Sequence, residues 1–65
     1  MSRALVVIPT FNEADNIRKL IPKVLSKAEG IEVLVVDDNS QDGTASCVRD
    51  MMSTDRRIHL LERPS

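Results

Sequence analysis

The most constraining feature of the sequence is the stretch of residues 33–44, in which a short apolar run ends on two adjacent carboxylates. Residues 33–36 read Val-Leu-Val-Val, and Asp37 and Asp38 follow at once. A run of this kind is typical of a strand that is covered on both faces, as in a parallel sheet. The polar residues 39–42 then predict a loop that can lead into a helix. Because ligands of open α/β sheets bind outside the carboxyl ends of the strands, the two acids lie where a ligand is expected.

Apolar runs alternate with an amphipathic pattern over the rest of the chain. We expect strands at residues 4–8, 31–37 and 58–61, and a helix of about ten residues after the loop at 38–42, with Gly43 and Thr44 in its first turn. A longer first helix is predicted by apolar residues at spacings of three and four, which are Ile17, Leu20, Ile21, Val24, Leu25 and Ala28; Arg18, Lys19, Lys23 and Lys27 lie on its other face. This order predicts an α/β fold, the βαβαβ half of a doubly wound domain, with a parallel three-stranded sheet in the order 3-2-1.

Several residues predict where these elements begin and end. Pro9 cannot donate a ladder hydrogen bond and is expected to close the first strand. Asn12, with Asp15 three residues later, predicts a capping box at the start of the first helix. Pro22 predicts a kink or a broken turn within that helix, and Gly30 is expected to end it in the left-handed conformation.

Charge and composition exclude several classes of protein. Nine Lys and Arg residues stand against ten Asp and Glu residues, and there is one Phe with no Trp or Tyr, so we expect no nucleic-acid partner. Cys47 has no partner for an internal disulfide, which favours a reducing, cytoplasmic compartment, and we interpret it as a small apolar residue on a helix. His59 is interpreted as a surface residue. No stretch approaches the ~20 apolar residues that span a bilayer.

Two polar loops are predicted to meet at the carboxyl edge of the sheet, after the first strand at residues 9–13 and after the second at residues 37–40. Adjacent strands lie about 4.8 Å apart, so the loops are neighbours. A carboxylate here can accept hydrogen bonds from the N1–H and amino group of guanine, or from the N3–H of uracil, and Glu13 can accept from ribose hydroxyls. The chemistry therefore suits a nucleoside. Acids at strand ends also cap the helices that follow, so Asp37 or Asp38 could instead hold backbone N–H groups.

Other site chemistries find little support. The sequence contains neither GxGxxG nor GxxxxGK[ST], which argues against dinucleotide oxidoreductases and P-loop enzymes. No Ser-His-Asp or Cys-His set has a plausible placement. Asp37 and Asp38 are adjacent, and their side chains point to opposite faces of an extended strand, so they need not form one metal site.

Two motifs and their separation resemble the amino-terminal portion of inverting family 2 glycosyltransferases. The first is residues 6–13, Val-Val-Ile-Pro-Thr-Phe-Asn-Glu, followed by Asn16 and Ile17, and the second is residues 35–44, Val-Val-Asp-Asp-Asn-Ser-Gln-Asp-Gly-Thr. The likeness is greatest to the polyprenyl-phosphate (dolichol-phosphate) mannosyltransferase branch, and it covers nearly all of the 65 residues.

The resemblance implies a GT-A type, Rossmann-like domain that binds a nucleotide-sugar donor, GDP-mannose or a related one, and uses Mg²⁺ or Mn²⁺ and a polyprenyl phosphate acceptor. Residues 1–65 would be the amino-terminal nucleotide-binding portion of an incomplete catalytic domain. By this resemblance the nucleotide-binding residues are Pro9, Thr10, Asn12, Glu13, Asp37, Asp38 and Ser40. Asp38 is favoured over Asp37 as the contact to the base, and Asn39, Ser40 and Asp42 match the motif that shapes the loop and opens the second helix.

The chain departs from the family's pattern in its later part, where nothing after Asp50 matches the Asp-x-Asp-like motif that holds the metal. We therefore expect the metal ligands, the catalytic base and the acceptor site to lie outside these residues, the chain alone to be inactive, and the full-length protein to work at the cytoplasmic face of a membrane. Two other classes remain open. One is a stand-alone nucleotide-binding or protein-interaction module that uses an open sheet edge, which also invites self-association. The other is a phosphoacceptor receiver domain, although neither later aspartate, Asp50 or Asp55, follows a predicted strand and no Lys occurs after Lys27.

Overall fold

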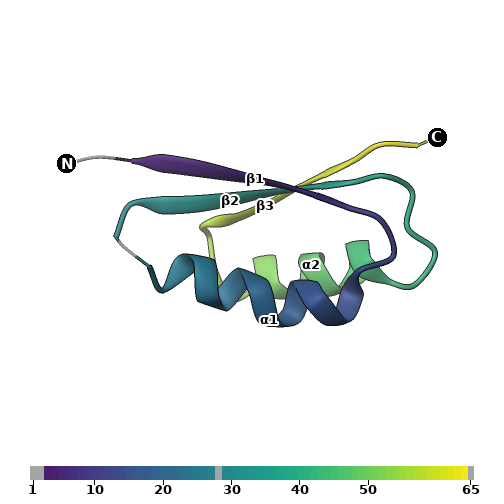
Figure 1. Cartoon of the computed structure of the whole chain (residues 1–65), viewed down its shortest axis with the longest axis horizontal. Coiled ribbons are helices and arrows are strands. Elements are labelled where there is room, and N and C mark those ends of the chain that lie inside the picture. The colour runs from purple at the N-terminus through teal and green to yellow at the C-terminus, as the bar shows by residue number, and fades with distance from the viewer. Residues whose placement is uncertain (1–2, 28, 65) are drawn as a thin grey trace.

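The computed structural model describes residues 3–27 and 29–64, which form alternating strands and helices (Figure 1). The elements are β1 (Ala4–Thr10), α1 (Ala14–Leu25), β2 (Ile31–Asp37), α2 (Thr44–Met52) and β3 (Ile58–Glu62). All three strands are parallel and lie in the order β1-β2-β3, which is the predicted order 3-2-1 seen from the other edge. The predicted α/β fold is confirmed.

Strand β1 extends two residues beyond the predicted end, and Pro9 lies within it opposite Val36. The hydrogen bonds explain why Pro9 is tolerated. Ala4 N donates to Gly30 O at 3.0 Å, and Thr10 O accepts from Asp38 N at 3.0 Å, so the backbone groups of alternate residues face β2. Pro9 falls between them and turns its nitrogen toward the open edge, where no ladder bond is lost.

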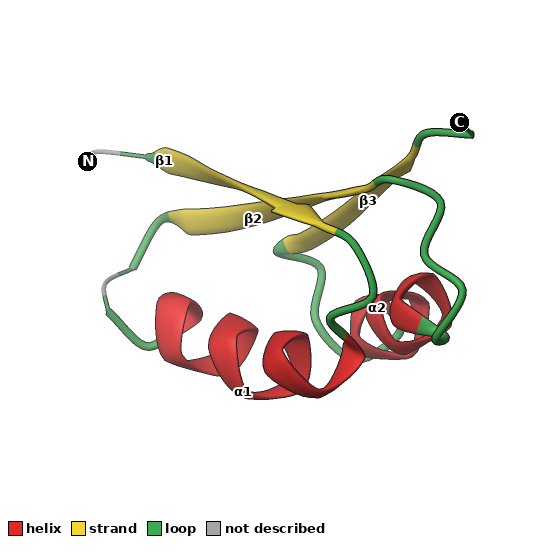
Figure 2. Cartoon of the chain, turned by 45° about the vertical axis from the view of Figure 1, so that its right-hand side comes forward, coloured by secondary structure: helices red, strands yellow, loops and turns green. Residues whose placement is uncertain are grey.

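Both helices pack on the same face of the sheet, which corrects the expectation that β2 is covered on both faces (Figure 2). Two right-handed crossovers that step in the same direction place both helices on one side. The core lies between helices and sheet and consists of Ile17, Ile21, Leu25, Val33, Val35, Val48 and Ile58. On the other face, Leu5, Val7 and Leu61 are each more than half exposed.

The ends of α1 differ from the prediction. The residue that precedes the helix is Glu13 and its side chain makes no capping bond, whereas Asn12 has a φ of 53° and lies in the loop. The helix continues through Pro22 without a broken turn and ends at Leu25, followed by Ser26. Gly30 is left-handed as predicted, with a φ of 82°, but it leads into β2 instead of ending the helix.

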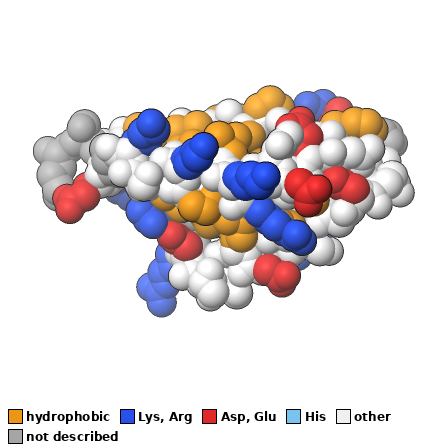
Figure 3. All heavy atoms as spheres, turned by 60° about the horizontal axis from the view of Figure 1, so that its bottom comes forward, with side chains coloured by type: hydrophobic (Ala, Val, Ile, Leu, Met, Phe, Trp, Pro, Cys, Tyr) orange, Lys and Arg blue, Asp and Glu red, His pale blue; other side chains and the backbone are white. Residues whose placement is uncertain are grey.

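The predicted solvent-facing side of α1 is confirmed. Arg18, Lys19, Lys23 and Lys27 are exposed, and Figure 3 shows Lys and Arg side chains spread over this face of the molecule. Leu20 was assigned to the apolar face but is 41% exposed, and Ala28 lies outside the described residues. Within residues 3–27 and 29–64, no helix is both long and apolar enough to cross a membrane.

The remaining side-chain predictions concern α2 and β3. Cys47 is buried on α2 as a small apolar residue, and it accepts a hydrogen bond from Arg18 Nε at 3.2 Å. Met51 packs against the core. His59 lies on the surface as predicted, with its Nε2 atom 2.8 Å from Glu32 Oε1.

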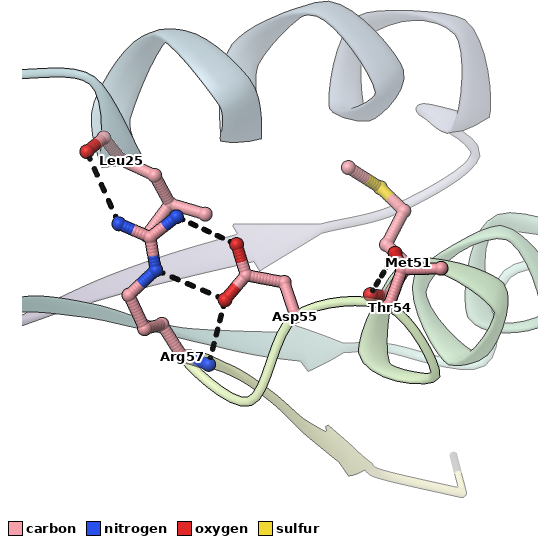
Figure 4. Close-up of polar contacts among 5 residues, drawn as sticks. All are labelled: Leu25, Met51, Thr54, Asp55 and Arg57. Carbon is pink, nitrogen blue, oxygen red and sulfur yellow. Dashed lines mark hydrogen bonds and ion pairs between the residues drawn. The ribbon is translucent and has the colours of Figure 1, made fainter.

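At the amino end of the sheet, Asp55 and Arg57 form an ion pair within the turn before β3, and Arg57 also reaches the end of α1 (Figure 4). Arg57 donates from Nε to Asp55 Oδ1 at 2.9 Å and from Nη2 to Asp55 Oδ2 at 2.6 Å, and its Nη1 atom lies 3.5 Å from Leu25 O. Beside this pair is a hollow of about 330 Å³, the amino-end hollow, which is lined by Ile21, Pro22, Leu25, Ser26, Met51, Thr54, Asp55, Arg57 and Ile58.

Candidate functional site

The candidate site lies at the opposite end of the sheet, where β1 and β2 end side by side. Thr10 and Asp37 are paired in the register as the last residues of their strands. The loop after β1 reaches α1 within three residues, and the loop after β2 reaches α2 within six. The predicted juxtaposition of the two loops is therefore present. It follows from the parallel pairing, which brings the carboxyl ends of both strands to one edge.

Asp37 is a buried residue that connects the end of β1 to the loop after β2. Its side chain is 2% exposed and Thr10 is 3% exposed. Asp37 Oδ1 accepts from Thr10 Oγ1 at 3.0 Å and from Ser40 Oγ at 2.5 Å, and Oδ2 accepts from Ser40 N at 3.1 Å. Burial raises the pKa of Asp37, but the hydrogen bonds from Ser40 and Thr10 outweigh this effect and leave the pKa below its ordinary value. Asp37 is therefore a buried, ionised acceptor.

Asn12 and Ser40 join the two loops across the edge. Asn12 N donates to Ser40 Oγ at 2.8 Å, and Gln41 N donates to Asn12 Oδ1 at 2.7 Å. Both Asn12 and Asn39 have a positive φ, of 53° and 60°, in the left-handed region that asparagine tolerates better than most residues. These reversals turn each loop toward the other.

Asp42 caps the first turns of both helices. Its Oδ2 atom accepts from Ala14 N at 3.1 Å, at the start of α1, and its Oδ1 atom accepts from Thr44 N at 3.1 Å, at the start of α2. Thr44 Oγ1 also donates to Asp42 and accepts from Glu13 N at 3.1 Å. The Thr44 hydroxyl and the Ala14 amide hold the pKa of Asp42 below its ordinary value. The cap of α1 predicted from Asn12 is thus supplied by an acid of the other loop.

Two other acids at this edge do not hold the loops by hydrogen bonds. Asp38 and Glu13 are exposed, and within the described residues neither carboxylate makes a hydrogen bond or ion pair. Pro9 is exposed beside them, on the open edge of β1. Glu13 lines a surface depression along α1 with Asn16, Lys19, Leu20 and Lys23.

A second depression at this edge, the carboxyl-edge hollow, has a volume of about 310 Å³. Its lining residues are Asp37, Asn39, Ser40, Ala45, Glu62, Arg63 and Pro64. Arg63 was not singled out for a binding role by sequence reasoning. Its backbone N donates to Asp37 O at 2.8 Å, which continues the pairing of β2 with β3 beyond Glu62. The one available signal was its place directly after a strand, at the edge where ligands of such sheets bind.

The described residues do not fit a metal site. Over residues 3–27 and 29–64, no group of three His, Cys, Asp or Glu side chains is placed to hold an ion. Asp37 and Asp42 use their oxygen atoms on hydroxyl and amide donors, as described above. This edge can therefore accept hydrogen bonds through Asp38 and Glu13 and offer a cation through Arg63, but it supplies no complete ligand set for a metal.

Comparison with known proteins agrees with the sequence resemblance. A model of the family described as "Glycosyl transferase family 2" matches residues 5–65. The polyprenol monophosphomannose synthase of Mycolicibacterium smegmatis is 38% identical over 64 residues, which is 97% of this chain and 24% of that protein. The undecaprenyl-phosphate mannosyltransferase of Micrococcus luteus is 34% identical over 61 residues, which is 94% of this chain and 25% of the relative.

A solved structure shares the fold. A mannosyltransferase from Pyrobaculum calidifontis, in complex with GDP-Man and Mn²⁺, matches with a TM-score of 0.79 and 33% identity, over 97% of this chain and 20% of that one. The chain spans about a quarter or less of the length of these proteins. The match to the family model covers nearly the whole chain, as does the similarity to the mannosyltransferases. The chain belongs to glycosyl transferase family 2.

Proposed function

We propose that this chain forms one wall of the nucleotide-sugar site of a family 2 glycosyltransferase, with GDP-mannose as the donor and a polyprenyl phosphate as the acceptor. One observation carries the proposal. At the carboxyl edge, the polar groups of Thr10, Asp37, Ser40 and Asp42 hydrogen-bond to one another and to the backbone, while Asp38 stays exposed and unpaired among the described residues. An exposed carboxylate on a fixed loop is suited to accept paired hydrogen bonds from a base.

The other residues have proposed roles along the same edge. Glu13 accepts from ribose hydroxyls, and Pro9, Thr10 and Asn12 shape the loop along which the nucleoside lies. Arg63 is the cation of the carboxyl-edge hollow and would attract the negatively charged phosphates. A divalent cation of the kind bound in the Pyrobaculum structure would neutralise the diphosphate of the donor, with its ligands outside the described residues, which do not fit one.

The donor proposal is tested by titrating the chain with GDP, GDP-mannose and UDP in a calorimeter. Because a hydrogen bond to a charged group contributes about 1.5–3 kcal/mol, Asp38→Asn is expected to weaken GDP binding about ten- to a hundredfold. Asp50→Asn is the matched control, since Asp50 is an exposed aspartate on α2 away from this edge. No binding of any nucleotide at millimolar concentration would reject a preserved base site.

The acceptor and the sugar are tested in a chimera. The segment of the Mycolicibacterium synthase that aligns with this chain, 64 residues, is replaced by the present sequence. We expect the chimera to transfer mannose from GDP-mannose to polyprenyl phosphate, and to lose transfer when Asp38→Asn is added. A folded chimera that binds GDP-mannose but transfers no mannose would contradict the acceptor proposal. Such a reaction implies that the complete protein works at a membrane surface, on its cytoplasmic side.

We also propose that the open edge of β1, next to the uncovered sheet face, drives self-association of the isolated chain. Leu5 is 56% exposed and Val7 is 55% exposed on that face. Exposed edge strands with apolar side chains are templates for further pairing. Sedimentation velocity should show oligomers at high concentration that Val7→Lys disperses. A wild-type chain that remains monomeric at millimolar concentration would refute this.

A further inference from the structure

We propose that Asp37 is a positioning residue for the nucleotide site: it does not touch the base, but it fixes the loop that carries Asp38. This inference rests on the proposed function and gives Asp37, which the family resemblance placed second to Asp38 as the contact to the base, a separate role of its own.

The first argument is the acceptor capacity of Asp37. Two hydroxyl donors bind Oδ1, one backbone amide binds Oδ2, and the side chain is 2% exposed. A base that bound there would have to displace Thr10 or Ser40 from a buried carboxylate, which would leave their hydroxyl or amide donors unsatisfied. The Asp38 carboxylate requires no such exchange, because it is exposed and makes no hydrogen bond or ion pair among the described residues.

The second argument is the way in which the donors of Asp37 tie the loop down. Thr10 ends β1 and Ser40 lies three residues along the second loop, so one carboxylate connects the two. Ser40 Oγ also accepts from Asn12 N at 2.8 Å, so the network extends into the loop after β1. The peptide group that joins Asp37 to Asp38 is held from both sides, since Asp38 N donates to Thr10 O and Asp37 O accepts from Arg63 N. Asp38 thus leaves the sheet in one defined direction.

A positioning role has a thermodynamic signature that a direct contact lacks. If only a fraction f of the molecules has the loop in the binding conformation, every apparent Kd is the intrinsic Kd divided by f. The factor is the same for GDP and for UDP, whatever the base. Loss of a contact to the base changes the two affinities by different amounts, because guanine offers two donors to a carboxylate and uracil offers one.

The experiment measures the Kd of GDP and of UDP for the wild-type chain, Asp37→Asn, Asp38→Asn and Asp55→Asn. The last is the matched control, an aspartate at the amino end of the sheet. We expect Asp37→Asn to raise both Kd values by about tenfold and to keep their ratio, whereas Asp38→Asn changes the ratio. Ser40→Ala should act like Asp37→Asn, and Ser40→Thr, which keeps the hydroxyl, should restore most of the affinity.

Global unfolding is separated from loosening of the loop by two further readouts. Circular dichroism and urea denaturation establish that each variant is folded under the binding conditions, and amide hydrogen exchange reports on single residues. In Asp37→Asn, the amides of Asn12, Asp38 and Ser40 should lose protection while those of Val33 and Val35 keep it. A purely structural role would lower protection in the core as well.

The outcomes are distinct. A changed GDP-to-UDP ratio in Asp37→Asn would show that Asp37 contacts the base and would overturn the inference, as would unchanged affinity and unchanged exchange in the loop. If the wild-type chain binds neither nucleotide, the proposed function fails for this chain. Hydrogen exchange then still decides whether Asp37 holds the loop, and retained protection in Asp37→Asn would reject that role.

Discussion

The two ends of the sheet use polar groups in different ways. At the carboxyl edge, side chains of one loop bind the backbone of the other, so Asn12, Ser40 and Asp42 shape the loops and leave Asp38 exposed. At the amino end, Arg57 and Asp55 bind each other in a bidentate pair beside an apolar hollow. A loop held by hydrogen bonds that presents an unpaired carboxylate is suited to bind a ligand. In the amino-end pair, the carboxylate and the guanidinium already bind each other. The two hollows have nearly the same volume, about 330 and 310 Å³, so the exposed carboxylate and not the volume distinguishes the carboxyl edge.

The largest expected effect comes from a core substitution at the amino end. Ile21 is fully buried and lines the amino-end hollow, so Ile21→Ala enlarges a space that already exists. We expect a loss of about 2–5 kcal/mol in the free energy of unfolding. A domain of this length has roughly 3–10 kcal/mol at about 0.05–0.15 kcal/mol per residue, so the variant would be partly unfolded.

Urea denaturation measures this loss, and Leu20→Ala is the control on the same helix, at a position that is 41% exposed. The molecules that remain folded should bind GDP as tightly as the wild-type chain, once the Kd is corrected for the folded fraction. Equal losses for Ile21→Ala and Leu20→Ala would contradict the packing described here.

A smaller effect is expected at the carboxyl edge, where Thr44 is fully buried and bridges the two loops. Thr44→Val keeps the shape but leaves the Glu13 amide without its acceptor, which should cost about 1–3 kcal/mol. Thr54→Val at the amino end is the matched change, since Thr54 is exposed and, among the described residues, its hydroxyl binds only Met51 O.

Urea denaturation of the two valine variants should therefore differ clearly, and only Thr44→Val should reduce the affinity for GDP. If Thr54→Val were the more damaging of the two, the polar network of the carboxyl edge would not be the more important one for stability.

The smallest effect is a pH dependence at the amino end. Hydrogen bonds from the Arg57 side chain and backbone lower the pKa of Asp55 from 3.8 to about 2. A carboxyl whose pKa is lower in the folded state stabilises that state above about pH 4, and this contribution is lost as the pH falls toward 2. Both groups are partly exposed, so screening by solvent keeps the effect small.

The urea midpoint measured between pH 5 and 2 checks this prediction. In Asp55→Asn the fall of the midpoint on acidification should be shallower than in the wild-type chain. An identical acid profile in both proteins would show that the ion pair of Figure 4 does not contribute to stability.

Much of the fold could be predicted because it depends on local patterns. The apolar runs at residues 31–37 and 58–61 and the spacing of Ile17, Ile21 and Leu25 predicted the strands and the first helix, and short parallel connections determine the strand order. The same logic placed Asp37 and Asp38 at the carboxyl edge.

The sequence by itself thus determined the order of the elements and the position of the acids, because these follow from hydrophobic period and chain connectivity. Only the tertiary structure decided which hydrogen-bond partners each acid has. Asp42 caps a helix that begins 28 residues earlier, and Thr44 binds an amide 31 residues away, so rules that compare near neighbours could not find either contact. Only the tertiary structure shows that Asp37 is saturated by Thr10 and Ser40 while Asp38 is exposed, because Thr10 is 27 residues away in the sequence.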